Sequence, residues 1–243
     1  MKRLLYGVVA WGVLLGLTGP AKAQYDYTRI DVPGSIFTYP SGINDAGQMV
    51  GAYFGADYIL HGFLIDVDGS YTTIDVPNAT STNAYGINAS GQIVGYYTDA
   101  GGGHGFLSDI DGSYTTIDVP GAVRTYANGI NDAGQIVGGY ADTLFNQHSF
   151  FLDVDGSYTT IDVPAAIETS ALGINGNGQI VGLYVGSAGR FGFLLDVDGT
   201  YTTLRVPSTT DNGASGINEA GQIVGWYMDA NGFSHGFLAT PVP

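Results

Sequence analysis

Histidines and aspartates recur at fixed positions along this chain of 243 residues, and they are the side chains best suited to chemistry. Each of the four histidines begins a short apolar stretch; they are His61, His104, His148 and His235. Imidazole is a common metal ligand, but one ring in each copy of a repeat is too far from the next ring to share an ion bonded at about 2.1 Å. We therefore expect each ring to hydrogen-bond to the backbone and so to tie its strand to a neighbouring loop.

Pairs of aspartates form a second recurring group, within Asp-x-Asp-Gly segments. Clustered carboxylates are typical Ca²⁺ ligands, but these segments lack the third aspartate and the distal glutamate of an EF-hand loop. Asp-Gly between two β-prone stretches is typical of a hairpin turn, which we expect here, with Ca²⁺ binding as the weaker alternative. The weak calcium candidates are Asp66, Asp68, Asp109, Asp111, Asp153, Asp155, Asp196 and Asp198. We expect no other metal and no cofactor.

Groups that could form a catalytic site are scarce. The chain has no cysteine, which excludes disulfides, thiol catalysis and cysteine-ligated zinc. Its two glutamates, Glu168 and Glu219, fall on opposite faces of the fold expected below, which disfavours the carboxylate pair of a glycoside hydrolase. Because every histidine belongs to a repeat, no Ser-His-Asp set stands out. The sequence favours a protein without catalytic activity.

Residues 1–23 have the three parts of a secretory signal peptide. A short basic segment precedes the apolar stretch Leu4–Leu17, and Ala21-Lys22-Ala23 is a small-x-small cleavage site. The apolar stretch is too short to span a membrane comfortably. We expect cleavage after Ala23, a secreted or periplasmic location, and no insertion into a membrane after cleavage.

Loss of that segment makes an acidic protein more acidic. It removes every lysine and takes the formal net charge from −15 to −18. So negative a chain is not suited to bind nucleic acid or an anionic membrane. The absence of lysine also excludes Schiff-base catalysis in the mature protein.

The tripeptide Gly-Ile-Asn recurs five times at spacings of 44, 43, 44 and 43 residues. A constant period of this length is typical of solenoids, propellers and arrays. Each unit contains four short stretches rich in Ile, Val, Thr, Tyr and Phe and bounded by Gly, Asn and Asp, and none shows helical periodicity. Four strands per unit predict one propeller blade. The units span about 25–69, 70–112, 113–156, 157–199 and 200–243.

The two ends of the chain complement each other. We name the four stretches of a unit a, b, c and d in chain order; the last unit lacks stretch d, whereas Tyr27–Asp31 is a d-like stretch with no c stretch before it. Pairing the two would close a ring. We therefore predict that residues 24–243 form a single all-β domain, a five-bladed β-propeller. It would have four antiparallel strands per blade, and the N-terminal strand would complete the last blade. A β-solenoid is the alternative.

The repeat Gly-Ile-Asn-Asp-Ala-Gly-Gln-Ile-Val-Gly-x-Tyr, followed by His-Gly-Phe-Leu, resembles the bacterial extracellular HAF repeat, named for a His-Ala-Phe tripeptide. Here the tripeptide reads His-Gly-Phe in three units, His148-Ser149-Phe150 in the third and Phe191-Gly192-Phe193 in the fourth. The resemblance covers the whole mature chain. It implies a secreted bacterial protein but no particular activity.

Residues that depart from the repeat are our candidates for binding. In a propeller, the a–b and c–d turns lie on one face and the b–c and d–a loops on the other. The b–c loops differ in length and composition, and variable loops on a rigid scaffold commonly bind ligands. Aromatic rings there could stack on sugars, and charged residues on the same face could hold hydroxyl or carboxylate groups. The candidates are Tyr58, Phe145, Phe233, Arg124, Glu168 and Arg190.

These observations predict a secreted, non-catalytic repeat protein that acts as an extracellular or periplasmic binding module through its b–c loops, with a glycan as the candidate ligand. The alternative is a structural or protein-interaction scaffold whose partner is a protein of the envelope or matrix. A glycoside hydrolase comes third. We expect the protein to be a monomer.

Overall fold

The computed structural model describes residues 29–209 and 211–241. The predicted signal peptide and the first two residues of the predicted closing strand therefore lie outside the described residues. The described part contains nineteen β-strands and no α-helix, which confirms the all-β prediction. Accordingly, none of these residues belongs to a helix that could cross a membrane.

The strands follow the sequence repeat, with four strands in each of the first four units and three in the last. The first unit comprises β1 (Phe37–Ile43), β2 (Met49–Phe54), β3 (Leu60–Ile65) and β4 (Tyr71–Ile74). The second comprises β5 (Ser81–Ile87), β6 (Ile93–Thr98), β7 (Gly103–Ser108) and β8 (Tyr114–Ile117). The third comprises β9 (Arg124–Ile130), β10 (Ile136–Ala141), β11 (Gln147–Leu152) and β12 (Tyr158–Ile161). The fourth comprises β13 (Glu168–Ile174), β14 (Ile180–Gly186), β15 (Gly189–Leu195) and β16 (Tyr201–Leu204). The fifth comprises β17 (Asn212–Ile217), β18 (Ile223–Met228) and β19 (Ser234–Ala239).

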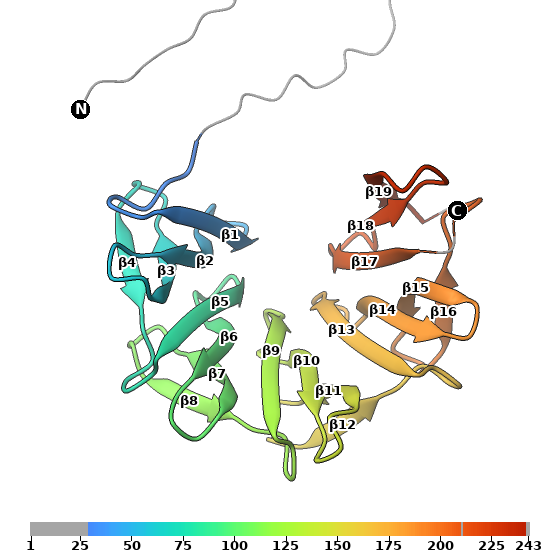
Figure 1. Cartoon of the computed structure of the whole chain (residues 1–243), viewed down its shortest axis with the longest axis horizontal. Coiled ribbons are helices and arrows are strands. Elements are labelled where there is room, and N and C mark those ends of the chain that lie inside the picture. The colour runs from blue at the N-terminus through green and yellow to red at the C-terminus, as the bar shows by residue number, and fades with distance from the viewer. Residues whose placement is uncertain (1–28, 210, 242–243) are drawn as a thin grey trace, which may run out of the picture.

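Within each unit, neighbouring strands pair antiparallel in chain order. One parallel pairing, Gly103 with Arg124, joins the second and third units into one continuous sheet, and an isolated parallel bridge, Arg190 with Asp211, links the fourth unit to the fifth. The units stand side by side in an arc, with the first strand of each unit innermost (Figure 1). The arc is open between the first unit and the last, and Arg29–Asp31 form no strand.

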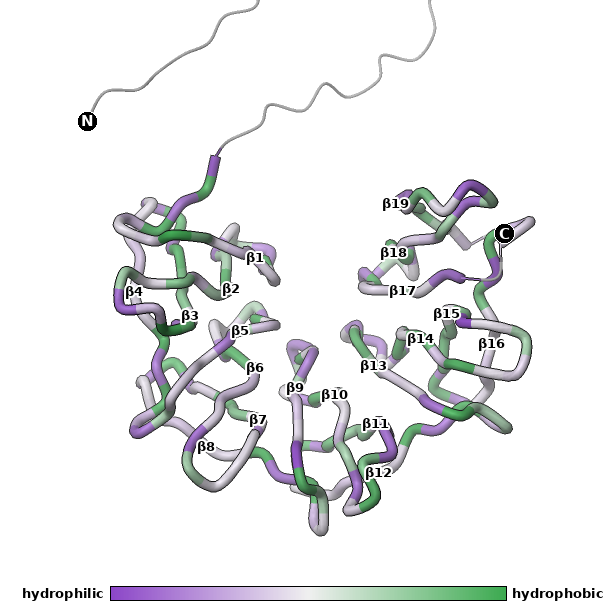
Figure 2. Tube along the Cα trace, viewed as in Figure 1, coloured by the Kyte–Doolittle hydropathy of each residue, from purple (hydrophilic) through white to green (hydrophobic). Residues whose placement is uncertain are grey.

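The hydrophobic core is distributed over the units rather than gathered in one centre, as the spread of hydrophobic segments in Figure 2 shows. In the second unit, the ring of Phe106 is fully buried against Gly95. A Cβ atom at Gly95 would lie 2.1 Å from the carbonyl oxygen of Asn83 and 2.7 Å from the Phe106 ring, so only glycine fits. The same close approach recurs at Gly51, Gly138 and Gly182, which explains the glycine in every Ile-Val-Gly or equivalent stretch.

The asparagine of Gly-Ile-Asn connects each unit to the next. In the third unit, the Asn131 Oδ1 atom accepts the N–H of Gln135, while Nδ2 donates to the Gln135 side chain. The same Nδ2 also donates to the main-chain carbonyl oxygen of Asn175, the equivalent residue of the fourth unit, at 3.1 Å. Asn44, Asn88 and Asn175 make the same bond to the following unit at 3.0–3.1 Å.

We expect Asn131→Ala to lower the free energy of unfolding by about 2 kcal/mol or more. The substitution leaves a buried carbonyl and buried N–H groups without partners, and each orphaned group costs about 1–3 kcal/mol. Urea unfolding would measure the loss. The matched control is Asn146→Ala in an exposed loop, where the side chain bonds only to Asp142, and a cost below about 1 kcal/mol is expected. Equal losses in the two variants would contradict a special role for the inter-unit bond.

Candidate functional site

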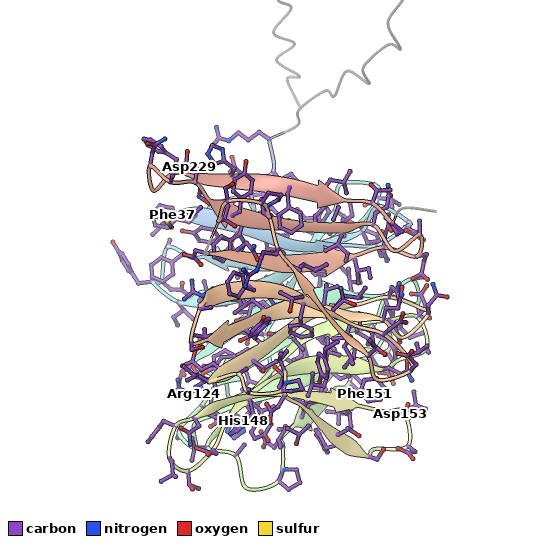
Figure 3. The ribbon with its side chains drawn as sticks, turned by 90° about the vertical axis from the view of Figure 1, so that its right-hand side faces the viewer. Phe37, Arg124, His148, Phe151, Asp153 and Asp229 are labelled. Carbon is purple, nitrogen blue, oxygen red and sulfur yellow. The ribbon has the colours of Figure 1, made fainter. Side chains whose placement is uncertain are left out.

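The two faces of the arc differ in composition. Figure 3 shows Arg124, His148 and Asp229 on one side, and Asp153, in a c–d turn, on the other. We refer to the first side, which carries the b–c and d–a loops, as the b–c face, and to the second as the turn face. The six residues that the sequence singled out all lie on the b–c face, in b–c loops or at the adjoining ends of β9, β13 and β15.

The three aromatic candidates project from b–c loops. Tyr58, Phe145 and Phe233 are 75%, 69% and 67% exposed. Tyr58 and Phe145 have a left-handed backbone, each with φ of 64°. The loop of Phe145 is closed by main-chain hydrogen bonds from Phe145 N–H to Asp142 and from Asp142 N–H to Asn146. These rings are held outward by turn geometry and are free to contact a ligand.

Two charged candidates line grooves between units. Arg124 borders a groove of about 410 Å³ between the second and third units, together with His104 and Asp118. Glu168 borders a groove of about 220 Å³ between the third and fourth units, with His148 and Asp162. Each groove thus combines a repeated His–Asp pair with one charged residue that differs from unit to unit.

A tyrosine cluster that the sequence analysis missed lies beside Arg124. The Nη1 atom of Arg124 donates to the Tyr126 hydroxyl at 3.3 Å. The Tyr126 ring stacks on Tyr96, with centroids 4.3 Å apart. Burial, and secondarily the neighbouring tyrosines, raise the pKa of Tyr85 to about 12. The sequence does mark two of these tyrosines as departures from the repeat. The position of Tyr85 holds Ser41, Asn128, Leu172 and Ser215 in the other units, and that of Tyr96 holds Ala52, Gly139, Leu183 and Trp226.

Arg190 lies near the start of β15, at the boundary of the fourth and fifth units. Its Nη1 atom lies 3.5 Å from an Asp211 carboxylate oxygen, and its guanidinium group lies 5.9 Å from the centre of the Trp226 ring. Because 3.5 Å is long for a charge-assisted hydrogen bond, Arg190 keeps donor capacity for another acceptor.

The histidines lie beside carboxylates, so the prediction that they hydrogen-bond to the backbone was wrong. In the first unit, His61 Nδ1 lies 2.8 Å from Asp75, at the end of strand d, and Nε2 lies 3.0 Å from Asp57, in the b–c loop. His104 and His148 likewise lie between two aspartates. The ring ties strand c to strand d and to its own loop through side chains, because both segments supply an aspartate in these units.

The carboxylates set the protonation of His61. Burial of the ring acts to lower the pKa, but hydrogen bonds to Asp75 and Asp57 and the charges of both outweigh it. The pKa of His61 is therefore raised above its ordinary value. The partner Asp57 has a lowered pKa, owing first to a hydrogen bond from the backbone of Ile59 and then to His61.

On the turn face, the Asp-x-Asp-Gly carboxylates are used within the turns. Asp66 Oδ1 accepts the N–H of Val67, and Asp68 Oδ1 accepts the N–H of Ser70. Gly69 has φ of 81°, as the turn requires. The other three copies make the same bonds. Among residues 29–209 and 211–241, no group of three or more His, Cys, Asp or Glu side chains is placed to hold a metal ion.

A pocket of about 490 Å³ lies on the turn face at the axis of the arc and is lined by the Ile-Asn segments of all five units. Two of its three acidic residues have structural partners: Asp132 accepts the N–H of Ala89, and Glu219 accepts the N–H of Gly176. The two glutamates of the sequence therefore stand apart, Glu219 here and Glu168 at a groove of the b–c face.

Comparisons with known proteins bear on the fold. No family model and no curated protein sequence matches the chain. A putative TolB from Agrobacterium tumefaciens has a TM-score of 0.64 at 16% identity, covering 85% of this chain and 77% of its own. TolB from Acinetobacter baumannii has a TM-score of 0.63 at 13% identity, covering 80% and 50%. A catalytically inactive virginiamycin B lyase from Staphylococcus aureus, with quinupristin, has a TM-score of 0.53 at 15% identity, covering 88% and 74%. At such identities these likenesses show a β-propeller-like fold and nothing of activity.

We expect Asp75→Asn to lower the pKa of His61, measured by NMR titration of the imidazole, because it removes the carboxylate at Nδ1. Asp118→Asn, the same change one unit along, should leave His61 unaffected. Since the folded-state pKa is raised, the stabilisation from His61 is complete below the unfolded value of about 6.5 and is lost as pH rises through the folded value. Asp75→Asn should also make the free energy of unfolding fall less as the pH rises through this range. A His61 titration identical to the wild type would contradict this account.

Proposed function

We propose that residues 24–243 form a secreted, non-catalytic binding module that takes a glycan on the b–c face. One observation carries the proposal: the loops that differ most between units in length and composition lie on that face, while the Asp-x-Asp-Gly turns of the turn face repeat from unit to unit. Exposed rings at Tyr58, Phe145 and Phe233 project from b–c loops on the same face as the grooves that Arg124 and Glu168 line.

This combination suits a sugar polymer. Rigid aromatic rings offer large contact areas at low cost in conformational entropy, and the apolar faces of sugar rings can pack on them. The grooves supply guanidinium, carboxylate and imidazole groups that can donate to or accept from hydroxyl groups. A protein-interaction scaffold remains the alternative, because exposed aromatics also anchor protein interfaces.

A catalytic role has less support. Hydrolysis of a glycosidic bond requires two carboxyl groups on either side of the bond. The two glutamates lie in different pockets, and the aspartates of the grooves are engaged with histidines in three successive units. We therefore retain the non-catalytic proposal.

We further propose that the chain is a HAF-repeat protein exported by residues 1–23. Both statements rest on the sequence, namely the repeated Gly-Ile-Asn and His-Gly-Phe motifs and the basic, apolar and small-x-small parts of the leader. Export would place the b–c face where extracellular or envelope polysaccharides are found.

We also propose that the arc closes into a five-bladed propeller. Its two ends expose apolar side chains whose equivalents are buried. Val224 is 51% exposed, whereas its equivalents Val50, Val94, Val137 and Val181 are 0% exposed. Ile43 is 67% exposed, against 8% for Ile87, Ile130 and Ile174. Contact between the first and last units would bury both residues.

Two polar groups at the open end also lack the partner that their equivalents have. The Asn218 side chain bonds to Gln222, but within the described residues it has no carbonyl of a following unit; closure would supply that of Asn44. His235 lies 3.3 Å from the loop residue Asp229 but has no aspartate from a strand d. The equivalent residue is Asp31, which pairs with Arg29 in the open arrangement. The proposed occupant of the free edge of β19 is therefore Tyr27–Asp31.

If the ring closes, the Asn218 side chain makes the same inter-unit hydrogen bond as Asn131. We expect Asn218→Ala to lower the free energy of unfolding by about 2 kcal/mol, as for Asn131→Ala, because the same inter-unit bond is lost. In an open arc only the bonds within its own turn would be lost, so the cost would be smaller than that of Asn131→Ala. A double-mutant cycle between Asp31→Asn and His235→Phe gives an independent test, since closure predicts a coupling energy above about 0.5 kcal/mol and an open arc predicts none.

We expect residues 24–243 to bind a defined class of glycan on a polysaccharide array, probed with calcium and with chelator. Tyr58→Ala, Phe145→Ala and Phe233→Ala should each weaken binding about tenfold, as loss of an aromatic contact does. The matched controls are Ile110→Ala and Val154→Ala, exposed apolar residues in c–d turns of the turn face. Absence of glycan binding in both conditions, with capture of a specific envelope protein by crosslinking, would favour the scaffold alternative.

A further inference from the structure

The fourth unit departs from the repeat in a concerted way. In the first three units a histidine lies between an aspartate of the b–c loop and an aspartate at the end of strand d. In the fourth unit the histidine is replaced by Phe191, the strand-d aspartate by Arg205, and the b–c loop has no acidic residue. A site with two carboxylates has become a site with a cation.

Two guanidinium groups lie at the same end of β15. Arg205 is placed over the face of the buried Phe191 ring, 4.1 Å from its centre. Arg190 precedes Phe191, and successive side chains of a strand point to opposite sides. Arg190 therefore extends from the other side of the strand, toward Trp226, 5.9 Å away. Within the described residues, Arg190 pairs with Asp211 at 3.5 Å, and Arg205 has no acidic partner.

The connections around this strand end leave the arginines accessible. Only Ser187 and Ala188 separate β14 from β15. The corresponding loops of the third and fifth units, residues 142–146 and 229–233, are longer and carry the exposed rings of Phe145 and Phe233. Both arginines are exposed, with 46% of the Arg190 side chain accessible to solvent. The two arginines thus belong to the unit that lies between the two units whose b–c loops carry Phe145 and Phe233.

The surrounding charge makes this arrangement selective. The chain carries a formal net charge of −15, and Arg190 and Arg205 are two of its seven basic residues. A distant polyanion is repelled by the molecule as a whole, but at physiological salt such repulsion is screened beyond about 8 Å. Contact at the arginines then depends on short-range pairing, for which a planar guanidinium group and a carboxylate are geometrically matched.

We propose that the fourth unit binds a carboxylate-bearing sugar, as found in a polymer of uronic acids. Arg190 and Arg205 pair with carboxylates of the polymer, and Trp226, Phe145 and Phe233 contact sugar rings. The inference rests on the proposed function and assigns its ligand class. Asp211 is a positioning residue, since it holds Arg190 beside Trp226 without occupying all its donors.

The test compares binding of polygalacturonate, dextran sulfate and neutral dextran to residues 24–243 in 0.15 M NaCl by calorimetry. We expect polygalacturonate to bind and the double variant Arg190→Gln/Arg205→Gln to lose at least about tenfold in affinity, as loss of charge-assisted pairs does. The matched control is Ala46→Asp/Ala133→Asp, which makes the net charge more negative by the same amount at exposed positions of the turn face. It should keep wild-type affinity. Melting curves establish that all variants fold.

Each other outcome is informative. Unchanged polygalacturonate affinity in the arginine variant, or equal losses in the arginine and control variants, would overturn the inference and leave the proposed function in place. Preference for dextran sulfate would overturn the assignment to carboxylates. Binding of neutral glycans alone would overturn the inference but support the proposed function. Failure to bind any glycan on the array would contradict both.

Discussion

The hydrogen bond from each repeat asparagine to the main chain of the following unit is the constraint on which the structure depends. This bond sets the distance and the relative position of the inner strands of neighbouring units. The donor–acceptor distance is 3.0–3.1 Å in all four copies. The strands must then approach closely: a Cβ atom at Gly42 would lie 2.8 Å from the Tyr85 carbonyl oxygen. The Gly-Ile-Asn tripeptide is thus one device, in which glycine permits the approach and asparagine holds it.

This constraint divides the residues of each unit into two classes. Residues that serve the inter-unit contact or the turns recur, including the turn aspartates, whose carboxylates cap N–H groups of their own turns. Side chains elsewhere are free to vary, and on the inner strands and the b–c face they do. The Tyr96–Tyr126 stack crosses from one unit to the next and exists only once in the described part of the chain. The repeated scaffold therefore carries an asymmetric surface.

Features that depend on neighbours in sequence could be predicted from sequence. The strands around Asp-x-Asp-Gly and Asn-x-Ala-Gly turns follow from local turn chemistry, and the period gives the number of units. Contacts set by strand register could not: His61 meets Asp75 because Gly62 pairs with Ile74 across β3 and β4, and nothing in the order of residues states that pairing. The sequence marks Tyr85 and Tyr96 as departures from the repeat, but it does not state their contact with Tyr126, which depends on how two units pack. Closure of the ring stays a prediction, because its strand begins at Tyr27, outside the described residues.

The fourth unit shows that the residue at the histidine position can change while the strands keep the same arrangement. In the first four units a side chain at this position of strand c contacts a residue at the end of strand d. An imidazole beside an aspartate provides this contact in the first three units, and the guanidinium of Arg205 over Phe191 provides it in the fourth. The fourth unit thus replaces a contact between an imidazole and a carboxylate with one between a guanidinium group and an aromatic face. Either contact is compatible with the same arrangement of strands. Folding therefore does not explain why the fourth unit presents arginine where the other units present aspartate, and we attribute this change to ligand binding.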